Sequence, residues 1–198
     1  MSLRCAAFLP LFLAVALALH VPGANAQAAA PFDLAHLMAH FASAKSASAQ
    51  FIERRYVHFL KAPLVAKGVL IFTAPDRLEK KTTEPAPEDM VIDGDTLTVQ
   101  REGQTQTLSL SAYPQIGAFI EGIRATLTGD VATLQRIYQA TLNGDANGWQ
   151  LVLEPRDPAM QAVVRSIAIS GRNEVIDRIE TVEHDGDRTD MRITEDGR

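Results

Sequence analysis

The chain has 198 residues, a formal net charge of −5 at pH 7 and 46% hydrophobic residues. This length fits a single globular domain preceded by a short leader. The mildly negative charge argues against a nucleic-acid partner, because proteins that bind nucleic acid present basic surfaces to the phosphates.

The first 26 residues have the pattern of a secretory signal peptide. Arg4 precedes an apolar run over residues 6–19, and the small-residue sequence "ANA" ends at Ala26. The apolar run is shorter than the ~20 residues that a membrane-spanning helix needs. We therefore expect cleavage after Ala26, with an uncleaved anchor as the alternative. The mature protein, residues 27–198, would then be one domain exported to a bacterial periplasm.

Cys5 is the only cysteine, and it lies before the apolar run. The lipid-modified cysteine of a bacterial lipoprotein follows such a run, so Cys5 does not fit that role. Cleavage after Ala26 leaves 18 basic residues, 24 acidic residues and no cysteine. The mature chain is therefore expected to have no disulfide and no thiolate chemistry, and its fold depends on its core alone.

The first half of the mature chain predicts one helix followed by antiparallel strands. Apolar residues at helical spacing predict a helix over residues 32–44. Alternating and β-branched runs then predict strands over residues 47–60, 64–73 and 77–83. Asp93-Gly94 and Glu102-Gly103 predict the tight turns of two further hairpins.

The pattern next becomes helical and then returns to strands. Apolar residues on one face predict a helix over residues 114–127, and Asp130 is expected to cap a second helix over 131–138 with Leu134 and Ile137 inward. Further strands follow, with turns about every 8 to 12 residues. This order indicates an α+β fold, in which one large curved antiparallel sheet carries helices on one side.

Two segments, "KGVLIFTAPDRL" and "PEDMVIDGDTL", give the chain a family resemblance. They fit a loose signature, Gly-x-Leu-x-Phe-x-x-Pro-x-x-Leu followed by Val-x-Asp-Gly. The matching residues are Gly68, Leu70, Phe72, Pro75, Leu78, Val91, Asp93 and Gly94. With the initial helix, "FIE" at residues 51–53 and "RTDMRI" near the end, the mature chain resembles LolA, the periplasmic carrier of outer-membrane lipoproteins, and its shorter LolA-like relatives.

The resemblance implies an incomplete, strongly curved antiparallel β-barrel whose apolar concave face is covered by helices. It implies a monomeric periplasmic carrier that binds a lipidated or amphiphilic cargo, either a lipoprotein or a lipid-linked product, in an apolar cavity. No cofactor is implied. An inner-membrane exporter would donate the cargo, and an outer-membrane lipoprotein would accept it.

The resemblance also implies which residues bind. The residues expected to line the cavity are Phe51, Leu70, Phe72, Leu78, Ile116, Phe119, Ile120 and Ile123. Apart from the resemblance, the basic runs "FIERRY" and "DRLEKK" predict a rim that contacts a headgroup or a partner, with Arg54, Arg77 and Lys80 as its residues.

Four alternatives stay open. Apolar strand faces usually form a filled core, and charge runs usually form a solvated face. Gly117 and Gly122, inside the helix over 114–127, fit either close packing or a lid that moves. A periplasmic lipid-sensing or assembly protein could use the same fold without transfer, although such sensors usually carry a second domain, for which this chain has no room.

Three departures from LolA put lipoprotein transfer itself in question. Ala74 stands where LolA has an arginine that helps to latch the lid. Lys80 stands where LolA tends to have an aromatic residue. The chain also stops at Arg198, whereas LolA continues into a further C-terminal strand.

Motifs for metal binding and catalysis are weak or missing. His36 and His40 are one helical turn apart, but Leu37 follows the first histidine where a zinc protease needs glutamate. No P-loop, dinucleotide fingerprint or nucleophile elbow is present in the sequence. We therefore expect no metal and no enzymatic activity, with a lipid-ester hydrolase as the minor alternative.

Overall fold

The computed structural model describes residues 32–173 and 175–195, so the expected signal peptide and its cleavage site lie outside the described residues. Eleven strands form one sheet in the order β6-β5-β4-β3-β2-β1-β11-β10-β9-β8-β7. The strands are β1 (Ser46–Tyr56), β2 (Leu64–Thr73), β3 (Arg77–Glu84), β4 (Glu88–Asp93), β5 (Thr96–Arg101), β6 (Gln104–Ser109), β7 (Tyr138–Asp145), β8 (Gly148–Pro155), β9 (Val164–Arg172), β10 (Val175–Glu183) and β11 (Arg188–Glu195).

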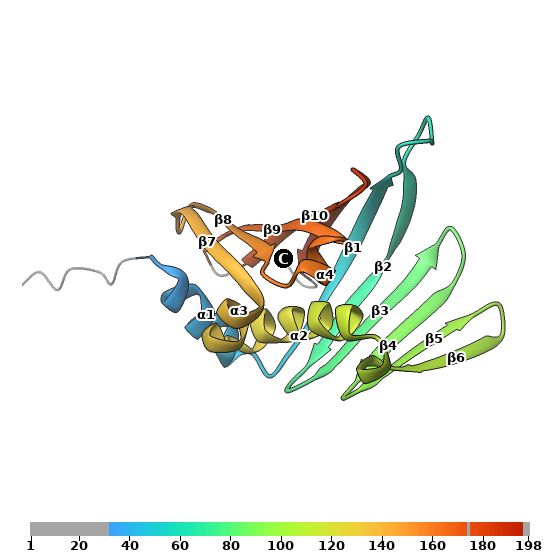
Figure 1. Ribbon diagram of the computed structural model, residues 1–198, viewed down its shortest axis with the longest axis horizontal. Helices are drawn as coiled ribbons and strands as arrows, with labels where there is room; N and C mark the ends of the chain where they lie inside the picture. Colours follow the sequence, from blue (N-terminus) through green and yellow to red (C-terminus); the bar gives the residue numbers. More distant parts are fainter. Residues whose placement is uncertain (1–31, 174, 196–198) are drawn as a thin grey trace, which may run out of the picture.

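Helices lie on one side of this sheet. They are α1 (Leu34–Ser43), the 3₁₀ helix η1 (Leu110–Ala112), α2 (Pro114–Thr128), α3 (Val131–Ile137) and α4 (Pro158–Gln161). Figure 1 shows β1–β6 as one wing, β7–β10 as the other, and α2 running across between them. In the described part of the chain, no helix combines the length and apolarity needed to cross a membrane.

The sheet is antiparallel throughout and does not close, because β6 and β7 remain as its two edges. This confirms the predicted α+β fold with an incomplete, curved barrel. In the middle of this order, the first strand of the chain, β1, pairs with the last strand, β11. The two wings therefore depend on a pairing between residues that are far apart in the sequence.

Local signals set most of the element ends. The Asp130 carboxylate accepts a hydrogen bond from the Thr133 backbone N–H at 3.0 Å, so it caps α3 as predicted. Gly129 ends α2 in the left-handed conformation, with φ at 70°, which suits glycine. The short helices η1 and α4 were not predicted, because each is a single turn with little periodicity to detect.

One predicted boundary is wrong. The strand expected over residues 47–60 ends at Tyr56 in β1. The His58 backbone N–H donates to the Asp187 carboxylate at 3.0 Å instead of to a strand, and the Leu60 N–H bonds back to the Val57 carbonyl at 2.9 Å. The chain therefore turns four residues earlier than its apolar character indicates.

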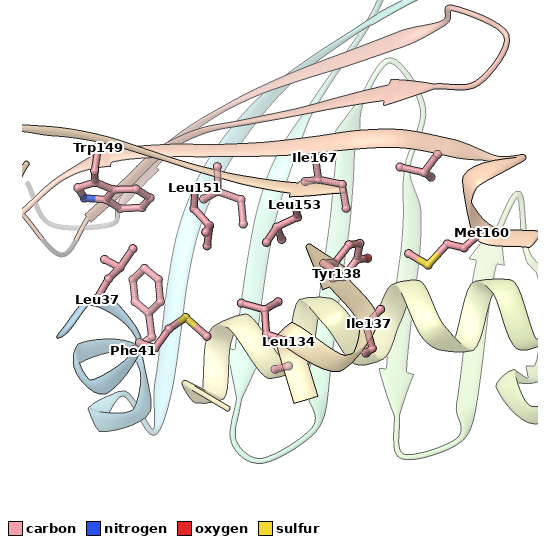
Figure 2. Close-up of a cluster of buried hydrophobic side chains, with 14 residues drawn as sticks. Leu37, Phe41, Leu134, Ile137, Tyr138, Trp149, Leu151, Leu153, Met160 and Ile167 are labelled. Carbon is pink, nitrogen blue, oxygen red and sulfur yellow. The ribbon is translucent and has the colours of Figure 1, made fainter. Parts of the chain in front are cut away.

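Two hydrophobic clusters flank the middle of the sheet. The first, drawn in Figure 2, packs α1 and α3 on β7, β8 and β9. Its buried residues are Leu37, Met38, Phe41, Ala125, Leu134, Ile137, Tyr138, Trp149, Leu151, Leu153, Met160, Val164, Ile167 and Ile169. The second has Ile92, Leu97, Leu110 and Ile120 buried, with Leu78, Met90, Val99, Leu108, Phe119 and Ile123 packed around them.

Helix α2 joins the two clusters and approaches its neighbours closely through its glycines. A Cβ on Gly122 would collide with the ring of Tyr138, and one on Gly117 would lie 3.2 Å from the Leu110 carbonyl oxygen. Both glycines therefore permit close packing, which is the first of the two explanations that the sequence left open.

Candidate functional site

We call the face of the sheet on which α2 packs the inner face. Directly paired residues on neighbouring antiparallel strands share a face. The pairs Phe72–Leu78 and Leu78–Ile92 connect β2 to the second cluster. The pairs Glu53–Met191, Met191–Ile179 and Ile179–Ile169 connect β1 to the first cluster. Both sets of residues therefore lie on the inner face.

Between the two clusters, the inner face carries a strip of apolar side chains that belong to neither. We call these residues the central strip. Its members, on β1, β2 and β11, are Phe51, Leu70, Phe72, Met191 and Ile193. Phe51 and Phe72 are buried, whereas Leu70, Met191 and Ile193 are only half-buried. The middle of the curved wall is thus apolar but less covered than its two ends.

The structure divides the eight expected cavity residues. Phe51, Leu70 and Phe72 lie in the central strip. Ile120 is buried in the second cluster, and Leu78, Phe119 and Ile123 are partly buried against it. Phe119 also packs against the first cluster.

Ile116 does not join the other expected cavity residues, since it is 41% exposed and lies outside the second cluster. The first turn of α2 instead packs through Gly117 against Leu110. A helix turns by about 100° per residue, so Ile116 points away from that contact.

Two pockets among the described residues lie away from the central strip. One is lined by residues of β7, β8, α4 and β9 and of the segments next to them, including Arg156, Arg165 and His184. The other lies at the turns between β3 and β4 and between β5 and β6. None of the expected cavity residues lines either pocket.

One ion pair interrupts the apolar inner face. The Lys80 ammonium lies 2.7 Å from the Glu53 carboxylate and 5.1 Å from the centre of the Phe51 ring. The Lys80 side chain is 28% exposed and that of Glu53 is 18% exposed. Lys80 is paired across strands with Leu70 of the central strip. A cation and a carboxylate therefore stand beside the strip, both with limited access to water.

The three cations expected to form a rim are not brought together. Strand alternation puts Arg54 and Arg77 on the outer face, opposite Lys80. Arg77 bonds there to Asp93 at 2.6 Å and to Glu79 at 2.9 Å. Hydrogen bonds from Arg77 and then Lys81 hold the pKa of Glu79 below its usual range. Arg54 and Arg77 therefore lie on the opposite side of the sheet from Lys80 and the central strip.

The outer face carries a ladder of ion pairs across β10 and β11. Arg178 bonds to Asp190 at 2.9 Å and to Glu180 at 2.6 Å. The Arg178 guanidinium lowers the pKa of Asp190. On β10 and β11, therefore, the outer face is charged and paired, in contrast to the central strip.

Arg124 is a positioning residue that the sequence analysis missed. From α2, its Nε donates to the Asp76 carbonyl at 2.9 Å and one terminal nitrogen donates to the Gly94 carbonyl at 2.7 Å. These carbonyls belong to the β2–β3 and β4–β5 turns. Arg124 therefore holds α2 to the turns at the edge of the sheet. Ala74, which precedes Asp76 in the β2–β3 turn, has no polar side chain that could bond to the helix in the opposite direction. An arginine next to the inward-facing Ile123 was the available signal.

His36 and His40 are exposed on the surface of α1. They belong to no group of three or more potential metal ligands among the described residues. In the described ranges, one group of three potential ligands lies close together, and it consists of His58, Asp185 and Asp187. The Asp187 carboxylate already accepts from the His58 backbone.

A family model described as outer membrane lipoprotein carrier protein LolA-like matches residues 26–194. No curated protein matches the chain.

Solved structures with a similar arrangement have low identity. The LolA superfamily protein NE2245 from Nitrosomonas europaea has 11% identity and a TM-score of 0.45, covering 80% of this chain and 90% of its own. The MucA/MucB complex of Pseudomonas aeruginosa has 14% identity and a TM-score of 0.47, and the match covers 82% of this chain and 56% of that one. The Mycobacterium tuberculosis lipoprotein LppX has 10% identity and a TM-score of 0.40, and the match covers 80% of this chain and 93% of that one. Because the family model spans nearly the whole described domain, the chain belongs to the LolA-like family.

Proposed function

We propose that this protein is a periplasmic carrier that binds the acyl or other apolar part of a lipidated or amphiphilic cargo on its inner face and moves it from the inner to the outer membrane. The observation that carries the proposal is the central strip. Leu70, Met191 and Ile193 are apolar, face the helices and remain half-buried between two packed clusters. An acyl chain laid on them gains ~0.8 kcal/mol for each CH₂ removed from water.

The Lys80–Glu53 pair supports an orientation for that cargo. It borders the strip at Leu70, so a tail on the strip puts its polar head near these two charges. An ammonium can bind phosphate or carboxylate, and a carboxylate can accept from an amine. A headgroup that carries both an anionic group and an amine would give Lys80 and Glu53 one partner each.

Transfer needs no nucleotide and no covalent step in this scheme. A carrier moves cargo from donor to acceptor when affinities rise along that route, because binding shifts an equilibrium only by differential affinity. An inner-membrane exporter would be the donor and an outer-membrane lipoprotein the acceptor. This carrier role, rather than catalysis, also fits the family description.

The test is mass spectrometry under mild conditions, with lipid extraction, on mature protein purified from a Gram-negative periplasm. Three forms are compared: wild type, Leu70→Glu, and Ile71→Glu as a matched control. Leu70 and Ile71 are both half-buried neighbours on β2, but only Leu70 faces inward. We expect cargo on the wild type and on Ile71→Glu, and none on Leu70→Glu.

Two results would count against the carrier. A folded Leu70→Glu protein that retains cargo would show that the strip is not the binding surface. A wild-type protein that stays free of ligand even with candidate lipids added would favour the alternative, a periplasmic sensing or assembly protein of the same fold.

A further inference from the structure

The loop between β1 and β2 exposes an unusual number of large apolar side chains. Residues 56–65, which we call the hairpin tip, contain five of the nine exposed large hydrophobic residues among those described. The five are Tyr56, Phe59, Leu60, Leu64 and Val65. Scattered single apolar residues on a surface are ordinary, whereas five exposed ones within ten consecutive residues indicate a candidate interaction site.

The position of the tip makes it accessible. Phe59 is 74% exposed and Leu64 is 56% exposed. Figure 1 shows this loop extending past the ends of the neighbouring strands. A surface that meets this end of the molecule would therefore contact the hairpin tip before the rest of the sheet.

The tip also has a defined shape. The Asp187 carboxylate accepts a hydrogen bond from the His58 backbone N–H at 3.0 Å, and the His58 ring packs edge-on against the Phe59 ring at 5.1 Å. At its base, the Arg188 guanidinium lies 4.5 Å from the centre of the Tyr56 ring. These contacts orient Phe59 outward, so its exposure is a feature of the fold.

The charge of the tip contrasts with that of the whole chain. Residues 56–65 hold Lys61 and His58 but no acidic residue, although the chain carries −5 overall. The His58 ring lies 2.9 Å from the Asp187 carboxylate and near Asp185, so the charge argument depends on Lys61. Lys61 is exposed and pairs with no acidic group in the described part of the chain. Aromatic and aliphatic side chains with an adjacent cation suit the interface of an anionic bilayer, where the rings enter the headgroup layer and the lysine stays at its surface.

We propose that the hairpin tip docks on lipid bilayers that contain anionic lipid, with Phe59, Leu60 and Leu64 entering the interface. Tyr56 lies five positions along β1 from Phe51 of the central strip, a distance of roughly 17 Å at ~3.3 Å per residue. Docking at the tip thus holds the inner face within reach of the membrane. The proposal depends on the hairpin tip alone and does not require the carrier function.

The experiment measures co-sedimentation of mature, cargo-free protein with vesicles of phosphatidylcholine and phosphatidylglycerol. The double variant Phe59→Ser/Leu60→Ser should bind ~10-fold more weakly or worse, because two interfacial anchors are lost. Lys61→Gln should bind ~5-fold more weakly at low salt and depend less on salt. Val163→Ser is the matched control, since Val163 is 53% exposed but lies outside the tip, and it should bind like the wild type.

Three outcomes would overturn the proposal. These are a wild type that does not bind anionic vesicles, equal losses in the Val163→Ser control, or binding to native membranes that is lost on pure lipid. The last would assign the tip to a membrane protein. Leu70→Glu separates this proposal from the carrier function, because it should lose cargo while keeping vesicle binding.

Discussion

Replacement of Arg124 by glutamine tests whether α2 acts as a latched cover of the inner face. The wild-type side chain donates to the carbonyls of Asp76 and Gly94 from a half-buried position. Glutamine is shorter and uncharged, so it cannot reach both turns. The packing of α2 through Ile120 and Ala125 into the two clusters is left intact.

The size of the effect follows from the two bonds. A hydrogen bond that involves a charged group contributes ~1.5–3 kcal/mol when its partner is not freely solvated. The half-exposed position and the access of water to the freed carbonyls reduce the total for both bonds to about 2 kcal/mol. Since 1.4 kcal/mol is a factor of ten, local opening of α2 should become roughly 30-fold more frequent.

Amide hydrogen exchange, followed by mass spectrometry of peptides covering α2, measures this opening. The matched control is Arg136→Gln, which removes an exposed pair with Glu121 at 2.7 Å. Such surface pairs contribute little, so the control should change exchange by less than ~5-fold. Peptides from β8, inside the first cluster, should be unaffected in both variants.

Arg124 does not latch α2 if Arg124→Gln and Arg136→Gln exchange alike over α2. The same holds if exchange rises equally in β8, because the helix would then open only when the whole domain unfolds. A selective rise in α2, with faster release of cargo, would identify Arg124 as the residue that holds the cover closed.

Three further predictions concern stability. Tyr138→Phe should raise the free energy of unfolding by about 1 kcal/mol in urea titrations, because the buried hydroxyl has no hydrogen-bond partner among the described residues; a loss of stability would mean that the hydroxyl is satisfied by water or a ligand. Gly122→Ala should lower the free energy of unfolding by about 1–2 kcal/mol, because overpacking against Tyr138 outweighs the better helix propensity of alanine. Gly148→Ala is the control, because open space surrounds Gly148. The pKa of Asp190 is lowered in the folded state, chiefly by its bond to Arg178, so its contribution to stability is present above its unfolded pKa and is lost as pH falls through the folded value. Asp190→Asn should therefore lose less stability than the wild type between about pH 6 and pH 3, and an equal loss would contradict the assignment.

The sequence predicted most elements because their signals are local. Strand β2 was predicted with the bounds Leu64 and Thr73 that the structure has, and the Asp93-Gly94 turn and the Asp130 cap follow from residue types within four positions. The end of β1 was predicted wrongly because its cause is not local. It depends on Asp187, 129 residues from His58.

The candidate site was only partly predictable. Strand alternation was enough to put Lys80 on the same face as Leu78, and the same reasoning would have excluded Arg54 and Arg77 from a shared rim. The division of the inner face into two clusters and a central strip could not be predicted in this way. It follows from the pairing of β1 with β11 and from the path of α2, both of which join distant parts of the chain.

The place of Lys80 and Glu53 in this division bears on what the inner face is for. A partly buried ion pair contributes little net stability, because desolvation of the two charges offsets their attraction, and apolar residues of similar size often serve as well. The neighbours across the strands, Leu70 and Met191, show that the wall accepts apolar side chains at these positions. Stability alone therefore gives no reason for a charged pair there. Recognition of a polar headgroup, at the border of a strip that can hold its tail, gives one.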